Sequence, residues 1–221
     1  MPLPGTVQSA PTGLKGFDAN TPISGSTAQA FVQAGYRFCI RYVGRTQMAS
    51  YDLTAGEAET ILNAGLALMT VQHVLNPGWS PTGALGTEYG TNAAAFTRQI
   101  GFPPGVNVWC DLECVADGAS AQDVIAYCNG WYDQVAAAGY VPGLYVGYQP
   151  GLTDDQLYSS LKFQHYWGAY NVDAVVPHRG WQLKQSVGSG GTIGGLTTEV
   201  YDDDHTMTDQ MGGTVLWLAS A

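Results

Sequence analysis

The sequence has few positive charges. Its 221 residues include 8 Lys and Arg against 18 Asp and Glu, which gives a formal net charge of −10 at pH 7. Nucleic acids and anionic membranes are bound mainly through clustered Lys and Arg, so this balance argues against both as partners. No apolar run approaches the roughly 18 residues of a membrane-spanning helix. The first residues also carry neither a basic start nor an apolar stretch, so no standard signal peptide is expected.

Cysteine is scarce as well, with residues at positions 39, 110, 114 and 128. Cys110 and Cys114 resemble a metal-binding spacing only superficially, because no histidine lies near them in the sequence. We therefore expect buried free thiols, no resident metal and no cofactor. A disulfide between Cys114 and Cys128 stays open for a protein that acts outside the cell.

Strand-like apolar runs alternate with helical patterns along most of the chain, which predicts an α/β fold with a parallel sheet and crossover helices. Eight such runs without a charge-rich linker favour one domain, a (β/α)8 TIM-type barrel that is irregular in its second half, where short connections replace helices. We assign residues 1–13 to a poorly ordered N-terminal tail and 14–221 to the barrel domain. The expected strands are residues 14–18, 37–43, 66–74, 106–113, 140–147, 165–170, 181–186 and 198–203.

Two carboxylates close the strand expected at 106–113. Side chains alternate along a strand, so Asp111 and Glu113 should share one face. Neighbouring acids on a buried face resist ionising together, which can keep one protonated while the other is charged. Cleavage of a glycosidic bond by general acid catalysis uses such a pair, although a helix N-cap beside a surface glutamate would give the same pattern.

Further acids occur at the ends of the first and last expected strands. Asp18 closes the first, and Asp202, Asp203 and Asp204 lie at the end of the last. In a closed barrel these strands adjoin, and the strand with Glu113 faces them across the mouth, where active sites of this fold lie. Alternation puts Asp202 and Asp204 on one face and Asp203 on the other, and the sequence does not fix which points inward.

Aromatic and polar side chains lie near the same strand ends. Aromatic rings cover apolar sugar faces while amides and carboxylates bind hydroxyl groups, so this set suits a carbohydrate. The candidate substrate-binding residues are Tyr42, His73, Tyr145, Tyr170, Gln182 and Asp204.

Several motifs together resemble glycoside hydrolase family 25, the lysozyme-type muramidases. They are Gly-Phe-Asp at 16–18, Asp-Leu-Glu at 111–113, Trp-Gln at 181–182 and the late Asp-rich strand. Arg-Tyr-Val-Gly-Arg at 41–45 is typical of a sister group, the glycoside-hydrolase-like domains of unknown function in actinobacterial secreted proteins and phage lysins.

The resemblance implies a role for each acid. Glu113 would be the general acid, and Asp111 would stabilise developing positive charge or orient a substrate N-acetyl group. Asp18 and Asp202 would lie opposite, binding sugar or tuning the pKa of Glu113. Asp202 is favoured over its two neighbours because it matches the family's late strand, although Tyr201 departs from that pattern.

The leading hypothesis is a monomeric, retaining glycosidase that cleaves a cell-wall polysaccharide, with peptidoglycan as the leading candidate. It would act as an extracellular or cell-wall-associated protein or as a phage-encoded lysin. The alternative is a glycan-binding cell-wall module of the same fold with little or no turnover. A third class is metal-dependent, with Asp202–Asp204 and His205 holding a hard cation.

Overall fold

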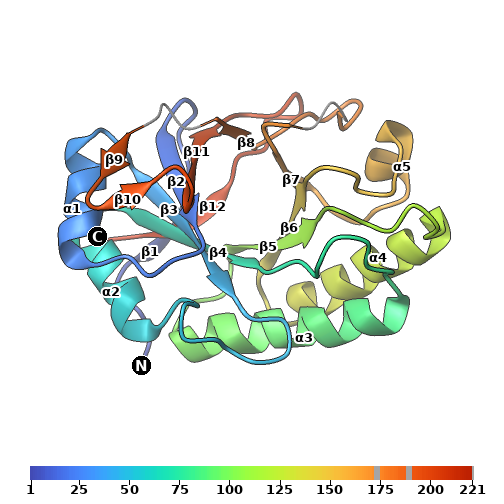
Figure 1. Cartoon of the computed structure of the whole chain (residues 1–221), viewed down its shortest axis with the longest axis horizontal. Helices are drawn as coiled ribbons and strands as arrows, with labels where there is room; N and C mark the ends of the chain where they lie inside the picture. Colours follow the sequence, from blue (N-terminus) through green and yellow to red (C-terminus); the bar gives the residue numbers. More distant parts are fainter. Residues whose placement is uncertain (172–174, 188–190, 221) are drawn as a thin grey trace.

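Eight strands close into a barrel in the computed structural model, which describes residues 1–171, 175–187 and 191–220 (Figure 1). Their order around the barrel is β4-β3-β2-β11-β8-β7-β6-β5, and pairing of β4 with β5 closes the ring. The predicted fold class is confirmed. The strands are β2 (Lys15–Ala19), β3 (Phe38–Val43), β4 (Ala67–Gln72), β5 (Asn107–Leu112), β6 (Val141–Val146), β7 (His165–Gly168), β8 (Leu183–Ser186) and β11 (Tyr201–Thr206).

The last barrel strand departs from the regular pattern. Strands β2 to β8 run parallel to their neighbours, whereas β11 is antiparallel to both β2 and β8. The expectation that the Asp triplet ends a parallel strand was therefore wrong. Asp202 lies near the start of β11, and because that strand runs in reverse, its start meets the carboxyl end of β2.

Helices cover the first half of the barrel from outside (Figure 1). Each begins after a Ser or Thr whose side chain accepts a backbone N–H of the first turn, the usual N-cap arrangement. Helices α3 and α4 lie side by side along the bottom of the view. The helices are α1 (Gly25–Gln33), α2 (Ala55–Asn63), α3 (Gly83–Ile100), α4 (Ala121–Ala137) and α5 (Asp154–Ser159).

The second half is irregular, as predicted. In the described ranges, the six-residue α5 is the helix that follows β6, and none is found between β7 and β11. A small hairpin, β9 (Thr192–Ile193) with β10 (Leu196–Thr197), precedes β11 and packs on α1. The Thr27 hydroxyl of α1 donates to the Gly194 carbonyl at 2.8 Å.

The expected poorly ordered N-terminal tail is instead part of the sheet. Strand β1 (Thr6–Ser9) pairs antiparallel with β12 (Leu216–Ala219), and Leu218 of β12 pairs with Leu68 of β4. The prediction of disorder was wrong because β12 buries Trp217 and Leu218 against the barrel and leaves an edge that β1 covers.

Aromatic rings fill the barrel below its mouth. Trp109 and Trp167 meet edge to face with ring centroids 5.8 Å apart, and Tyr145 contacts Trp167 at 4.5 Å. Both tryptophans are fully buried. This packed interior closes the barrel below the mouth, so a ligand can bind only at the mouth or on the outer surface.

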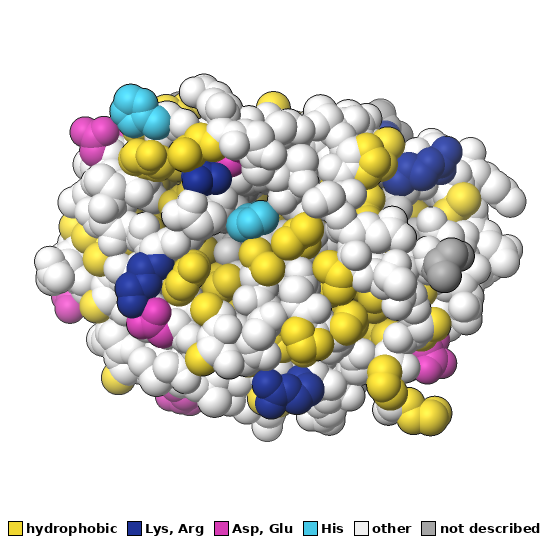
Figure 2. Space-filling model, turned by 180° about the vertical axis from the view of Figure 1, so that it is seen from behind, with side chains coloured by type: hydrophobic (Ala, Val, Ile, Leu, Met, Phe, Trp, Pro, Cys, Tyr) yellow, Lys and Arg dark blue, Asp and Glu magenta, His cyan; other side chains and the backbone are white. Residues whose placement is uncertain are grey.

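All four cysteines are free, which confirms the predicted thiols, although Cys114 is half-buried rather than buried. Within the described part of the chain, no helix has the length and apolarity to cross a membrane. On the face shown in Figure 2, Lys and Arg side chains are few and widely separated, so that face carries no continuous basic surface.

Candidate active site

Gln185 joins two of the predicted acids at the barrel mouth. Asp18 and Asp202 are directly opposed on β2 and β11, and the Gln185 Nε2 atom donates to Asp18 Oδ2 at 3.0 Å and Asp202 Oδ2 at 3.2 Å. The Tyr145 hydroxyl donates to Gln185 Oε1 at 3.1 Å, and the Tyr42 hydroxyl donates to Asp18 Oδ1 at 3.3 Å. The structure therefore brings four predicted site residues into one network.

Alternation along β11 decides which acids of the triplet face inward. Asp202 and Asp204 point into the barrel, where Asp204 is fully buried and accepts the Trp167 indole N–H at 2.8 Å. Asp203 points outward, where it accepts the Tyr36 hydroxyl at 2.5 Å and pairs with Lys15 at 3.1 Å. The metal-dependent alternative required Asp202, Asp203 and Asp204 to lie together, but Asp203 points away from the other two. Among the described residues, no group of three His, Cys, Asp or Glu is arranged to hold a metal ion.

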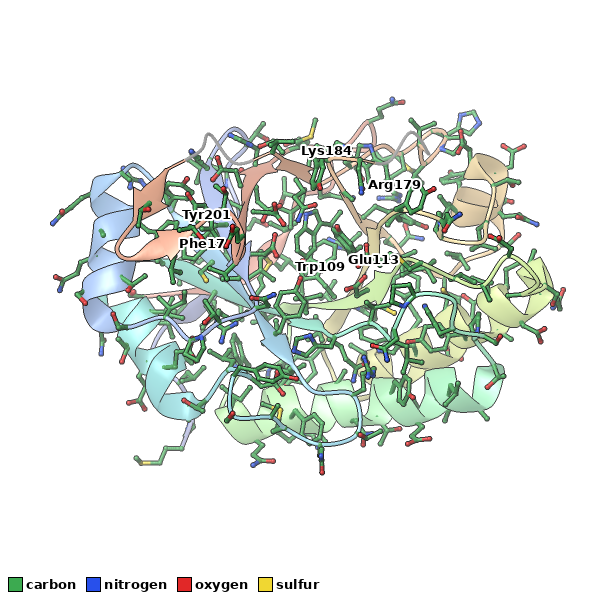
Figure 3. All side chains as sticks on the ribbon, in the orientation of Figure 1. Phe17, Trp109, Glu113, Arg179, Lys184 and Tyr201 are labelled. Atoms are coloured by element: carbon green, nitrogen blue, oxygen red, sulfur yellow. The ribbon has the colours of Figure 1, made fainter. Side chains whose placement is uncertain are left out.

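Asp111 and Glu113 share the inner face of β5, at different depths. Asp111 is 5% exposed and its Oδ1 atom is buried with no hydrogen-bond partner among the described residues, whereas Glu113 is half-buried. Figure 3 shows Glu113 and Trp109 near the centre of the molecule, with Phe17 and Tyr201 to one side of them. Of this pair, Glu113 is thus the carboxyl that solvent reaches more readily.

The side chain of Glu113 lies directly over Gly147, which follows β6. A Cβ atom on Gly147 would lie 2.5 Å from both Cβ and Oε2 of Glu113, so any larger residue would displace the carboxyl. Cys114 then turns the chain sharply with φ 53°, a region uncommon for residues other than glycine, and its N–H donates to the Tyr148 carbonyl at 2.6 Å. The indole N–H of Trp79 donates to the Glu113 carbonyl at 2.9 Å, which fixes the strand end from the other side.

Burial raises the pKa of every inward-facing carboxyl. For Asp18, burial followed by the charge of Asp202 raises the pKa to about 7. Burial also raises the pKa values of Asp111 and Asp204 well above the usual range, assisted by the charges of Glu113 and Asp18 respectively. Burial and the charge of Asp202 raise the pKa of Glu113. Several of these groups hold protons at a pH where ordinary carboxyls are ionised.

An aromatic wall stands beside the acids. The rings of Tyr42 and His73 stack with centroids 4.6 Å apart, and Tyr51 contacts His73 edge-on at 5.6 Å. The His73 Nε2 atom hydrogen-bonds to Asp52 Oδ1 at 2.8 Å. Tyr51 and Tyr170 are each 50% exposed, and the Tyr170 N–H reaches Gln185 Oε1 at 3.5 Å. Tyr42, His73, Tyr145 and Tyr170 therefore lie around the acids, as predicted from their strand ends.

Two hollows adjoin at this wall. One of about 380 Å³ is lined by polar residues that include Arg45, His73 and Asn76. The other, of about 440 Å³, lies between Asn20, His73 and Val200. Since His73 and Tyr51 line both, the two hollows adjoin and form one cleft. His73 connects this cleft to the acids, because it stacks on Tyr42, whose hydroxyl donates to Asp18.

A family model described as "Rv2525c-like, glycoside hydrolase-like domain" matches residues 29–213. The chain belongs to this family. No curated protein sequence matches this Rv2525c-like chain at a significant level.

Solved structures share the fold of this Rv2525c-like domain. The Tat-secreted protein Rv2525c of Mycobacterium tuberculosis, in complex with L-tartrate, matches with a TM-score of 0.66 and 16% identity over 91% of this chain and 98% of that one. A bacterial lysozyme from Streptomyces coelicolor matches with a TM-score of 0.59 and 16% identity over 93% of this chain and 94% of that one. A family 25 glycosyl hydrolase from Bacillus anthracis matches with a TM-score of 0.56 and 13% identity over 88% of this chain and 89% of that one. At these identities the similarity shows the fold.

Gln182 is the predicted site residue that the structure places elsewhere. It precedes β8, at the end of the barrel opposite the mouth, and is fully buried. Its side chain accepts the Tyr166 N–H at 2.6 Å and donates to the Gln164 carbonyl at 2.9 Å and to Asp209 at 2.5 Å. A separate hollow of about 410 Å³ beside Arg179 lies in this region, away from the acids. The prediction for Gln182 was wrong, because the glutamine of the cluster is Gln185, three residues later.

Proposed function

We propose that the chain is a glycoside hydrolase that cleaves a cell-wall polysaccharide, with peptidoglycan as the leading substrate. The observation that carries the proposal is the convergence of Asp18, Asp111, Glu113, Asp202 and Asp204 at the barrel mouth with raised pKa values. Carboxyls that titrate in different ranges at one cleft can supply both the acid and the charged partner of glycoside hydrolysis.

Glu113 is the general acid in this proposal. It is half-buried directly after β5, and burial together with the charge of Asp202 raises its pKa, so the carboxyl keeps its proton to a higher pH than an exposed glutamate. It would give that proton to the leaving glycosidic oxygen as the bond to the anomeric carbon breaks. A water molecule would complete the hydrolysis by bonding to the anomeric carbon and returning a proton to Glu113. Gly147 and Trp79 hold the strand end and side chain in place for this transfer.

Asp111 is assigned a positioning role behind Glu113. It is buried, and the charge of Glu113 contributes to the rise of its pKa, which means that ionisation of either group disfavours ionisation of the other. A protonated Asp111 lets Glu113 exchange its proton during a reaction cycle without placing two charges on one strand face.

Asp18 and Asp202 form the opposite wall. Gln185 bonds to both carboxylates, and Asp202 is half-buried. In this proposal the charge of Asp202 stabilises the positive character that develops on the sugar ring. Tyr51 and Tyr170 offer half-exposed rings for stacking on sugar faces. With family members of known structure that include a Tat-secreted protein, we assign the activity to the extracellular space or cell wall, or to a phage lysin, and to a monomer.

The test is release of reducing ends from a panel of purified cell walls by wild-type protein and by Glu113→Gln. We expect release by the wild type and loss of at least about 100-fold in the variant, since general acid catalysis contributes about 10²–10⁴-fold. Mass spectrometry of the products identifies the bond. Glu88→Gln, an exposed glutamate on α3, is the matched control and should retain full activity.

If wild-type protein releases no reducing ends from any wall but pelleting assays show that it binds them, the chain is a glycan-binding module instead. Equal release by wild type and Glu113→Gln would contradict the assignment of the acid.

A further inference from the structure

We propose that Arg45 forms a carboxylate-binding subsite beside the acid cluster, which selects a glycan carrying a carboxylate on a sugar next to the scissile bond. This inference rests on the proposed function for the position of the bond, and it names the substrate class. The subsite is the polar hollow of about 380 Å³ lined by Arg45, Tyr51, His73 and Asn76.

Arg45 is half-buried, and its side chain is not paired with any group in the described part of the chain. Among the described residues its side chain makes no hydrogen bond and no ion pair within 4.0 Å, although five donors are available on it. Its positive charge opposes the rise of the Asp111 pKa, which places it close to the acid cluster. A planar fork of donors in a partly dehydrated hollow suits a carboxylate, which it can bind through two parallel hydrogen bonds.

The backbone that carries Arg45 is fixed rather than loose. The Asn92 side chain of α3 donates to the Arg45 carbonyl at 2.7 Å, and the Gln72 amide of β4 donates to the Gly44 carbonyl at 3.0 Å. A Cβ atom on Gly44 would lie 1.9 Å from the Gln47 carbonyl, so only glycine permits this turn. The turn therefore fixes the backbone from which the Arg45 side chain extends, so no loop has to be ordered when a ligand binds.

Five other cations of the chain have different surroundings. Four of them pair with acids: Lys15 with Asp203, Arg41 with Glu57, Lys162 with Asp133 and Arg179 with Asp209. Arg37 is exposed next to the start of β3, far from the mouth, and donates to the Tyr36 carbonyl. Arg45 is thus the cation that lines the polar cleft beside the catalytic acids.

The negative charge around the site makes Arg45 important for binding a carboxylate. His73 lines the hollow and stacks on Tyr42, whose hydroxyl donates to Asp18, so the hollow adjoins the acid cluster. Asp52 lies in its wall, where His73 and the Ala49 N–H bind its carboxylate. A glycan carboxylate approaching this surface meets repulsion from the acids and from the net charge of −10. Arg45 offsets that repulsion at one place, so the carboxylate is accepted in one register along the cleft.

The experiment measures binding by calorimetry in the Glu113→Gln background, where nothing is hydrolysed. The probes are a tetrasaccharide of alternating N-acetylglucosamine and N-acetylmuramic acid, whose lactyl groups carry carboxylates, and a uronic acid tetrasaccharide. Each is compared with its carboxyl-reduced form. We expect the carboxylate form of one probe to bind more tightly than its reduced form, and which probe does so identifies the source of the carboxylate.

Adding Arg45→Gln should weaken binding of the preferred carboxylate form by about 10- to 100-fold, as expected for hydrogen bonds to a charged group, and leave the reduced form unchanged. Arg37→Gln makes the same charge change away from the mouth and should leave both unchanged. The thermal unfolding midpoint of each variant reports folding separately.

The subsite is refuted if carboxylate and reduced forms bind equally, if Arg45→Gln weakens both alike, or if neither form of either probe binds. These outcomes are distinct from failure of the proposed function. Discrimination without any release of reducing ends keeps the subsite and removes the hydrolase, whereas release without discrimination does the reverse.

Discussion

Replacing Asp18 with Asn should stabilise the protein at neutral pH. Asp18 is 4% exposed, and burial followed by the charge of Asp202 raises its pKa from 3.8 to about 7. Asparagine has nearly the same shape, and its amide can still bond with Gln185 and Tyr42, which contact the carboxylate in the wild type. The substitution therefore removes the cost of burying a charge and little else.

The sign and size of the effect follow from the shift in pKa. Because the folded-state pKa lies above the unfolded one, the favourable contribution of Asp18 is fully present below about pH 4 and is lost as the pH rises to about 7. Three pH units at about 1.4 kcal/mol each give an upper limit of about 4 kcal/mol. We expect Asp18→Asn to exceed the wild type by about 1–4 kcal/mol at pH 8 and to match it near pH 4.

Urea denaturation followed by tryptophan fluorescence from pH 4 to 8, at constant ionic strength, measures this difference. Asp133→Asn is the control, because Asp133 is half-exposed beside Lys162 and should change the free energy of unfolding by less than about 1 kcal/mol. Parallel curves for wild type and Asp18→Asn across the whole range would show that Asp18 has no raised pKa.

Three further predictions follow from the same contacts. Gly147→Ala should displace the Glu113 side chain, lower the rate of glycan hydrolysis about tenfold or more, and lower the unfolding midpoint, because the new methyl group would lie 2.5 Å from the Glu113 Cβ atom. Asp202→Asn should shift the alkaline limb of the pH–rate profile to lower pH, because the charge of Asp202 is one of the two causes that raise the pKa of Glu113. Tyr36→Phe should cost about 1–3 kcal/mol in urea denaturation, because it removes a buried hydrogen bond to Asp203.

Each of these has a control or a contrary result. Gly118→Ala adds the same methyl group where nothing lies within 4 Å, so it should leave the rate unaltered. If the pH–rate profile of Asp202→Asn overlays that of the wild type, the charge of Asp202 does not raise the pKa of Glu113. For Tyr36→Phe, the comparison is Tyr148→Phe at a half-exposed ring, and equal losses for the two would exclude a special contribution from the buried bond.

Much of the barrel is visible in the sequence because its strands are buried. The strand expected at 106–113 appears as β5 (Asn107–Leu112), and β3 (Phe38–Val43) differs from its prediction by one residue. Apolar runs of this kind report burial on both sides of a parallel strand, and flanking glycines mark where each run stops. They carry no information on direction, which is why antiparallel β11 was misread.

The residues of the candidate site also divide into those that the sequence identifies and those that it misses. Asp111 and Glu113 were found because alternation along one strand relates them, and this needs no knowledge of other strands. Gln185 was missed because its place beside Asp18 and Asp202 depends on the register of β8 against β11. Arg45 ends the Arg-Tyr-Val-Gly-Arg motif at 41–45, but the motif did not indicate that its side chain lines a hollow, since an arginine in a turn usually lies in solvent.

Because β11 runs in the reverse direction, the connection between β8 and β11 can change in length without affecting how the barrel closes. Strand β8 ends at the mouth and β11 begins there, so the chain between Ser186 and Tyr201 has no need to travel back along the barrel. Lengthening such a connection costs only about 0.6 kcal/mol for each doubling of its length. Members of this fold can therefore diverge, or be diversified in the laboratory, at the segment nearest the acids while the barrel beneath keeps its packing.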